Sequence, residues 1–165
     1  MFKTKLLILS LISFIFLSCT KDTLDRDITK YSLGYIGGEY DGLILKNLLT
    51  SDLYNFRAYD DNSNFKIEST ISHSSELFIS NIDNTSDRMR IKSTITAKIV
   101  DIRFKCDTRT FKEDVIQFYL FADTEKYISN SVAEKKIKEQ NTETLVKEFI
   151  NKLMRSRGDC MIKHE

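Results

Sequence analysis

The chain carries few residues that could act as metal ligands or catalytic groups. Its two histidines are His73 and His164, so neither an HExxH helix nor a three-histidine zinc site can be assembled. We expect both to be solvated surface side chains. The sequence also lacks the GxSxG, GxxxxGKS/T and GxGxxG motifs of nucleophilic and phosphate-binding sites. We therefore predict a protein that is not an enzyme and that uses no metal or cofactor.

One segment has the spacing that opens a calcium-binding loop. Asp60, Asn62 and Asn64 stand at alternate positions, as the first ligands of such a loop do. However, Phe65 occupies the glycine position and Ile71 the position of the bidentate acid. Calcium binding at this segment is therefore rejected.

Three cysteines remain as groups for covalent chemistry. Cys106 and Cys160 lie far apart in sequence and have neither CxxC nor metal-ligand spacing. A disulfide needs alpha carbons within about 7 Å, which a sequence does not reveal. Two alternatives stay open, a disulfide between Cys106 and Cys160 formed in an oxidising compartment, and a pair of inert thiols.

The third cysteine, Cys19, follows an apolar segment at the start of the chain. Lys3 and Lys5 precede residues 6–17, which are Leu, Ile and Phe apart from two serines. This is the pattern of a secretory signal, and it is too short for a membrane-spanning helix of about 20 residues. We therefore treat residues 1–18 as a signal peptide and exclude them from fold prediction.

The sequence Phe16-Leu17-Ser18-Cys19 resembles the lipobox of bacterial lipoproteins. In that class the cysteine is diacylated, becomes the new N-terminus and receives a third acyl chain. The resemblance implies that Cys19 is lipidated and that its acyl chains anchor the protein in a membrane. Thr20 after the cysteine implies sorting to the outer membrane, on its periplasmic side. The alternative is a cleaved signal followed by a coincidental cysteine.

Composition indicates one domain without a strongly charged partner. Removal of residues 1–18 takes away Lys3 and Lys5 and changes the formal net charge from +1 to −1, so we expect no nucleic-acid partner. About 147 residues remain, enough for one domain with a hydrophobic core. We predict a lipidated tether at 19–27, one domain at 28–157 and a tail at 158–165.

Strand-like alternation marks the middle of the chain. It is clearest in Arg88–Val100, and residues 65–72 show it too, whereas residues 28–36 are a weaker candidate for a first strand. Val115–Ala122 is apolar on both faces, which predicts a strand covered on both sides. The charged residues 106–113 before it are expected to form a loop.

Helical spacing flanks these strands. Apolar residues recur at steps of three and four after Gly42, which predicts a helix over 39–53. A second stripe predicts a helix over 132–155 that ends before Gly158. Ser131 and Glu134 have the spacing of a capping box at its start.

The predicted order of elements is β-α-β-β-β-α. We expect an α+β two-layer sandwich, with two helices packed on one face of a roughly four-stranded, largely antiparallel sheet. The opposite face stays free, and either it is simply solvated or it serves for docking.

A row of basic residues lies on one side of the clearest predicted strand. Its members are Arg88, Arg90, Lys92 and Lys98. An aligned row of cations suits phosphorylated amphiphiles or an acidic partner surface. The alternative is that these charges protect the sheet from aggregation.

The order of these elements and several local sequences resemble the lipopolysaccharide-assembly lipoprotein family LptE, particularly its alphaproteobacterial branch. The matching stretches are the lipobox cysteine, Gly42-Leu-Ile-Leu-Lys-Asn-Leu-Leu49, Phe65-Lys-Ile-Glu68, Thr85-Ser-Asp-Arg88 and Tyr127-Ile-Ser-Asn-Ser-Val-Ala-Glu134. Together they cover most of the chain, and the resemblance rests on their order and spacing.

The resemblance implies a plug that sits inside a large outer-membrane β-barrel, an LptD-like translocon. Such a plug helps the barrel to assemble and assists delivery of lipopolysaccharide to the cell surface. Family members are thought to bind lipopolysaccharide through basic residues, for which Arg88, Arg90 and Lys126 are the candidates here. The alternative is a free-standing surface or periplasmic lipoprotein that acts as an adhesin or envelope scaffold.

Overall fold

The computed structural model of the protein describes residues 28–79, 87–104, 106–120 and 127–155. Six elements follow one another in the order predicted from the sequence. They are β1 (Ser32–Gly37), α2 (Glu39–Asn55), β2 (Phe65–Ile79), β3 (Asp87–Asp101), β4 (Cys106–Leu120) and α3 (Tyr127–Arg155). The predicted signal peptide, tether and tail, together with Cys19, Lys126, Gly158 and Cys160, lie outside the described residues.

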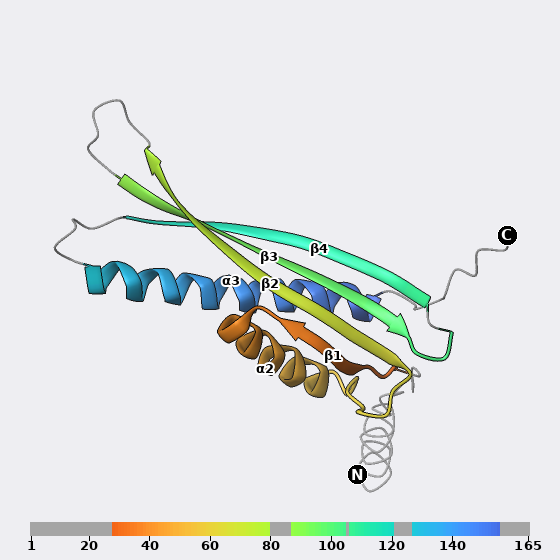
Figure 1. The fold of residues 1–165 in the computed structure, drawn as a ribbon. Coiled ribbons are helices and arrows are strands. Elements are labelled where there is room, and N and C mark those ends of the chain that lie inside the picture. Colours follow the sequence, from red (N-terminus) through yellow and green to blue (C-terminus); the bar gives the residue numbers. More distant parts are fainter. Residues whose placement is uncertain (1–27, 80–86, 105, 121–126, 156–165) are drawn as a thin grey trace, which may run out of the picture.

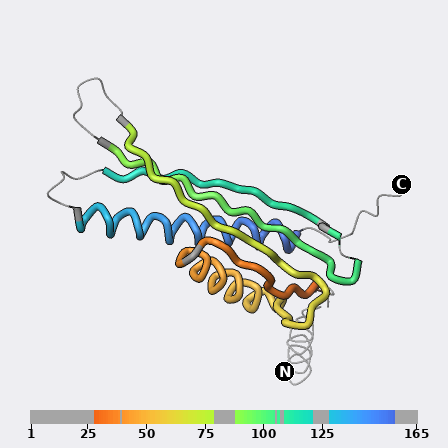
Figure 2. The backbone as a smooth tube through the Cα atoms, in the orientation of Figure 1, coloured from red at the N-terminus to blue at the C-terminus, as the bar shows by residue number. Residues whose placement is uncertain are grey.

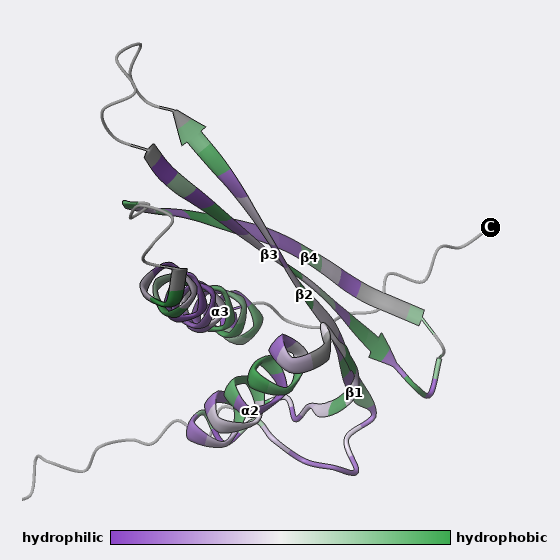
Figure 3. Ribbon diagram, turned by 60° about the vertical axis from the view of Figure 1, so that its left-hand side comes forward, coloured by the Kyte–Doolittle hydropathy of each residue, from purple (hydrophilic) through white to green (hydrophobic). Residues whose placement is uncertain are grey.

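The four strands form one sheet in the order β1-β2-β3-β4 (Figure 1). β1 pairs parallel with β2, whereas β2 with β3 and β3 with β4 are antiparallel. Both helices cover the same face of the sheet, and Figure 3 shows that no described helix covers the other face. The predicted two-layer α+β sandwich with a largely antiparallel sheet is therefore confirmed.

The sheet is elongated, because β2, β3 and β4 each have 15 residues whereas β1 has 6. At about 3.3 Å per residue, each long strand spans about 50 Å. Figure 2 shows that these strands continue well past β1 and α2. We call the end where β1 and β2 begin and where β3 leads into β4 the proximal end, and the opposite end the distal end.

The core lies between the helices and the inner face of the sheet. β3 alternates as predicted: Ile91, Ile95 and Ile99 are buried, whereas the polar side chains at the even-numbered positions 92, 94, 96 and 98 are partly exposed. The two helices contribute Leu45, Leu49, Leu53, Leu145, Val146, Phe149, Ile150 and Leu153, all buried. These apolar stripes hold the two layers together, since burying each such side chain stabilises the fold by about 1.5–3 kcal/mol.

Neither helix of the described ranges combines the length and apolarity needed to cross a membrane.

β4 is longer and more exposed than the sequence predicted. Residues 106–113, expected to form a loop, make up the first half of β4 and pair with β3. A long neighbouring strand supplies their backbone hydrogen bonds, so charged side chains that point to solvent do not end the strand. The expectation that Val115–Ala122 is covered on both faces is also wrong for its described part, because Phe118 and Leu120 are exposed on the helix-free face.

Cys106 is the first residue of β4 and is disulfide-bonded. The alternative in which Cys106 is an inert free thiol is therefore wrong. Cys160 lies outside the described residues, so the pairing of Cys106 with Cys160 stays a prediction.

α3 begins earlier than predicted, at Tyr127 instead of Val132. Ser131 and Glu134 therefore lie within the helix, and the predicted capping box is wrong. Glu134 instead accepts hydrogen bonds from Ser75 Oγ at 2.6 Å and from Lys138 Nζ at 2.7 Å. The spacing between Ser131 and Glu134 is that of a capping box, but the Glu134 carboxylate binds Ser75 on the sheet and Lys138 one turn further along α3.

Two glycines make the sharp connection between β1 and α2. Gly38 has φ of 122°, which favours glycine, and a side chain there would also meet Ile71. A Cβ on Gly42 would come within 2.9 Å of the carbonyl carbon of Gly37. These glycines let α2 start directly after β1 and fold back over the sheet.

α2 ends in a Schellman motif with an unusual residue in it. Ala58 N donates to Leu53 O at 2.8 Å and Arg57 N donates to Tyr54 O at 2.9 Å, which is the paired hydrogen bonding of that motif. The left-handed position of the motif is normally glycine, but here Arg57 occupies it with φ of 56°. The backbone of Arg57 is therefore strained.

We predict that Arg57→Gly raises the free energy of unfolding by about 1 kcal/mol, because glycine adopts the left-handed conformation without the steric cost of a side chain. Urea denaturation of the two proteins measures this difference. Arg57→Ala is the matched control, since it removes the same guanidinium but keeps the strain. Equal stabilisation by glycine and alanine would contradict the proposed cause.

Candidate functional site

The predicted row of basic residues lies on the helix-free face, as the alternation of β3 requires. Neighbouring strands partly neutralise it. Arg90 Nη1 lies 2.8 Å from Glu76 Oε1 of β2, and the two residues are directly opposite in the register. Lys92 Nζ lies 3.5 Å from Asp114 Oδ2 of β4. Both pairs are largely solvated, so each contributes at most about 1 kcal/mol.

At the distal end the same face combines cations with exposed apolar side chains. The register places Arg88 between Phe78 and Leu120, and Arg90 between Glu76 and Phe118. We call Phe78, Arg88, Arg90, Phe118 and Leu120 the distal patch. Its apolar members are 45% (Phe78), 48% (Phe118) and 69% (Leu120) exposed.

The aromatic members of the distal patch contact each other across β3. The ring centroids of Phe78 and Phe118 are 5.7 Å apart, with the rings inclined at 63°. Arg88 is exposed, and no described carboxylate pairs with it. The patch therefore offers an unpaired guanidinium beside an apolar surface, an arrangement that suits an anionic amphiphile.

The structure brings two of the three predicted lipopolysaccharide-binding residues together. Arg88 and Arg90 belong to the distal patch, whereas Lys126 lies outside the described residues. Phe78 and Phe118 are part of this site although the sequence did not predict them there. A signal for Phe118 exists, since residues 115–122 are apolar on both faces, but this pattern also predicts a strand covered on both sides.

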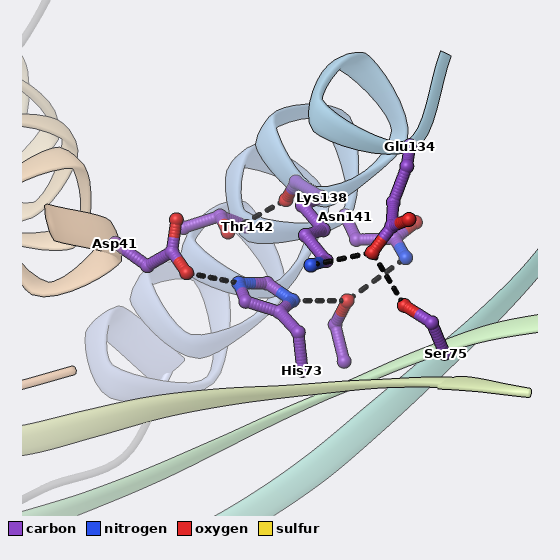
Figure 4. Close-up of polar contacts among 8 residues, drawn as sticks. Asp41, His73, Ser75, Glu134, Lys138, Asn141 and Thr142 are labelled. Atoms are coloured by element: carbon purple, nitrogen blue, oxygen red, sulfur yellow. Dashed lines mark hydrogen bonds and ion pairs between the residues drawn. The ribbon is translucent and has the colours of Figure 1, made fainter. Parts of the chain in front are cut away.

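A second polar feature lies on the helix-facing side of the sheet (Figure 4). It joins β2 and β3 to both helices, and we call it the interlayer polar cluster. Its members are Asp41 of α2, His73 and Ser75 of β2, Ser93 of β3, and Glu134, Lys138 and Asn141 of α3.

Ser93 is the centre of this cluster. Its Oγ lies 2.7 Å from His73 Nδ1 and accepts a hydrogen bond from Asn141 Nδ2 at 2.9 Å. On the other side of the imidazole, His73 Nε2 lies 3.7 Å from Asp41 Oδ2, which is an electrostatic contact and too long for a hydrogen bond. Asn141 interrupts the apolar stripe of α3, is fully buried and makes this polar contact with the sheet.

The electrostatics of the cluster differ between its two ionisable ends. Burial lowers the pKa of His73, the Asp41 carboxylate opposes this shift and the Lys138 ammonium adds to it. Burial raises the pKa of Glu134, but hydrogen bonds from Lys138 and Ser75 outweigh burial and leave that pKa below its usual value. The cluster is therefore most stable with a neutral imidazole and an ionised Glu134.

The expectation that His73 is a solvated surface residue is wrong, since its side chain is 4% exposed. The sequence around it, Ser72-His-Ser-Ser-Glu76, is polar at every position, so alternation does not reveal which side chains face the helices. Only the register with β3, which pairs His73 with Ser93, fixes its direction.

Ser93, His73 and Asp41 lie side by side as the serine, histidine and aspartate of a catalytic triad do, but the arrangement does not suit catalysis. Ser93 is completely buried, so a substrate cannot reach its Oγ. Within the described ranges, no group of three His, Cys, Asp or Glu side chains could hold a metal ion. The cluster therefore positions the helices on the sheet, and the distal patch is the candidate functional site.

Comparison with solved structures shows the fold of small bacterial lipoproteins. Rare lipoprotein B from Shewanella oneidensis is 12% identical, with a TM-score of 0.61 over 76% of this chain and 93% of that chain. A minor lipoprotein from Acinetobacter baumannii is 15% identical, with a TM-score of 0.59 over 78% of this chain and 92% of that one. Lipoprotein B from Nitrosomonas europaea is 10% identical, with a TM-score of 0.53 over 77% and 83%.

No model of a known protein family matches the sequence, and no curated protein matches it either. At these identities the structural likeness establishes the fold alone. The chain therefore shares the fold of rare lipoprotein B and of the other two lipoproteins, and this is the α+β fold with the element order predicted from the sequence.

We predict that acid weakens the fold through the interlayer polar cluster. The pKa of His73 is lower in the folded protein than the usual 6.5 of an unfolded chain. As the pH falls through about 6.5, the unfolded chain takes up this proton first, so stability is lost until the folded-state pKa is reached. The lowered pKa of Glu134 adds a further loss as the pH falls below its ordinary value of 4.5.

Urea denaturation at a series of pH values measures both contributions. With His73→Gln, the free energy of unfolding is expected to change less with pH just below pH 6.5. The loss of stability near pH 4 should remain, because it comes from Glu134. If the variant kept the same slope just below pH 6.5 as the parent protein, His73 would not be its source.

Proposed function

We propose that the protein is an outer-membrane lipoprotein that assists lipopolysaccharide assembly at the cell surface, as plug and assembly factor of a large LptD-like β-barrel. The observation that carries this proposal is the helix-free face of the sheet, with the distal patch at its end. The fold of rare lipoprotein B supports it. Lipidation at Cys19, on the periplasmic side of the outer membrane, is part of the same proposal.

The helix-free face has the chemistry of a surface that docks inside a polar barrel. It presents hydroxyl groups, as in Thr94 and Thr96, between charges of both signs from three adjacent strands. The interior of an outer-membrane barrel is polar, so its wall offers hydrogen-bond partners to such groups. An apolar face would instead have been costly to bring into a water-filled lumen.

The distal patch has the two chemistries that lipopolysaccharide requires. Arg88 and Arg90 can donate charge-assisted hydrogen bonds to lipid A phosphates. Phe78, Phe118 and Leu120 give acyl chains an apolar surface beside these cations. Lys126 is proposed as a third cation from the connection between β4 and α3.

We predict that the acylated protein, purified in detergent from native outer membranes, co-purifies with a large β-barrel. A plug is enclosed by its barrel, so protease added to intact cells should leave it uncut. Recovery of the lipoprotein alone, together with cleavage on intact cells, would contradict the plug and favour a free-standing adhesin or scaffold.

We predict that Arg88→Ala with Arg90→Ala weakens lipopolysaccharide binding by about tenfold or more, since each charge-assisted hydrogen bond is worth about 1.5–3 kcal/mol. Binding is measured at fixed salt, because exposed charges are screened. Lys46→Ala with Lys136→Ala is the matched control, as it removes two cations from the helical layer. Equal affinities of the two double variants would show that the distal patch does not bind the phosphates.

A further inference from the structure

Three separate segments meet at the proximal end of the domain. They are residues 28–30 before β1, residues 56–58 after α2 and residues 102–104 between β3 and β4. Lys30 Nζ donates a hydrogen bond to Arg57 O, and Tyr31 N donates to Ala58 O at 2.8 Å. Ile28, Lys30 and Arg103 also line one common pocket. These contacts make the proximal end one continuous surface.

This surface exposes apolar side chains from all three segments. Ile28 is 40% exposed, Phe56 45%, Ile102 46% and Phe104 65%. Single exposed apolar residues are ordinary on a soluble domain, but here four gather at one end. Apolar side chains that share one exposed surface indicate contact with an apolar or interfacial partner.

Basic residues accompany these apolar ones in the chain, since Arg57 follows Phe56 and Arg103 lies between Ile102 and Phe104. Arg103 pairs with the buried carboxylate of Asp101 at 2.9 Å, and its guanidinium stacks over Phe104 at 5.3 Å. Lys30 and Arg57 have no carboxylate partner among the described residues. The proximal end therefore presents two cations beside exposed aromatic rings, a combination that suits the headgroup region of a membrane.

Arg57 belongs to this surface although its backbone conformation is strained. Its backbone occupies the left-handed position of the Schellman motif, where glycine is favoured. Residues held in strained backbone conformations gather at functional sites more often than elsewhere. A cation placed there, next to Phe56, is consistent with a surface that has a binding role.

The chain outside the described structure indicates which partner lies at this end. The predicted acyl anchor, Cys19, precedes Ile28 by about nine residues, which span at most about 30 Å when fully extended. An anchor at Cys19 therefore holds the proximal end close to the bilayer. The distal patch is about 50 Å away along the long strands.

We propose that the proximal end docks on the phospholipid surface in which the acyl chains are anchored. Phe56, Ile102 and Phe104 enter the boundary between headgroups and acyl chains, and Lys30 and Arg57 contact lipid phosphates. This docking rests on the proposed acyl anchor and concerns the lipoprotein before a barrel encloses it. It adds a second membrane contact that fixes the orientation of the domain.

A single tryptophan tests this docking, because the chain contains none. Full-length acylated protein carrying Phe104→Trp is reconstituted into phosphatidylethanolamine–phosphatidylglycerol vesicles whose acyl chains are brominated. We expect a blue-shifted emission and strong quenching. The control, Phe118→Trp in the distal patch, is also at an exposed position and should stay unquenched.

The outcomes separate docking from anchoring. Protein that floats with the vesicles but shows no quenching at position 104 would overturn the docking and leave the anchor intact. Equal quenching at both positions would also overturn it, since the domain would then lie flat on the bilayer. Protein that does not float would overturn the anchor, and the docking with it, without bearing on lipopolysaccharide binding by the distal patch.

Arg57 gives a second, independent readout in the Phe104→Trp background. Arg57→Gly should stabilise the fold yet weaken docking about fivefold, as expected for one basic residue near an anionic surface. Arg57→Lys should retain docking, because it keeps the charge. Unchanged quenching with glycine would show that Arg57 contacts no lipid phosphate.

Discussion

The architecture depends on the alternation of β3, which pairs along its whole length with β2 and with β4. A shift of one residue in this register would turn every buried isoleucine of β3 to solvent and every lysine to the core. Burial of Ile91, Ile95 and Ile99 therefore fixes the register of the long strands. One face must then receive both helices, and the other is left to solvent or to a partner.

The two layers are not joined in the same way along their length. Toward the proximal end they meet through aliphatic and aromatic side chains, such as Ile67 and Phe149. Beyond Ile71 the helix-facing residues of β2 become polar, and the layers meet through His73, Ser93 and Asn141. Further on, Leu77 is already exposed. The distal part of the sheet thus extends past its own core, which leaves the distal patch accessible.

Sequence patterns predicted those parts of the structure in which one physical effect dominates. The apolar stripes of α2 and α3 and the alternation of β3 gave the element order and the layering, because burial outweighs local preferences there. The same patterns did not predict where α3 and β4 begin. At both positions, neighbouring strands and helices supply hydrogen-bond partners that a local sequence pattern does not contain. The direction of His73 was not predictable for the same reason. Arg88 and Arg90 were identified as a pair, whereas their aromatic neighbours depended on the register across three strands.

The long axis of the sheet separates the two surfaces that carry the functional proposals. A strand of about 50 Å exceeds the roughly 40–45 Å thickness of a bilayer with its headgroups. Inside a barrel, with its strands along the membrane normal, a domain of this length would reach from the periplasmic side to the level of the outer surface. The proposed docking and the proposed amphiphile binding thus lie at opposite ends of one dimension, which the pairing of three 15-residue strands sets.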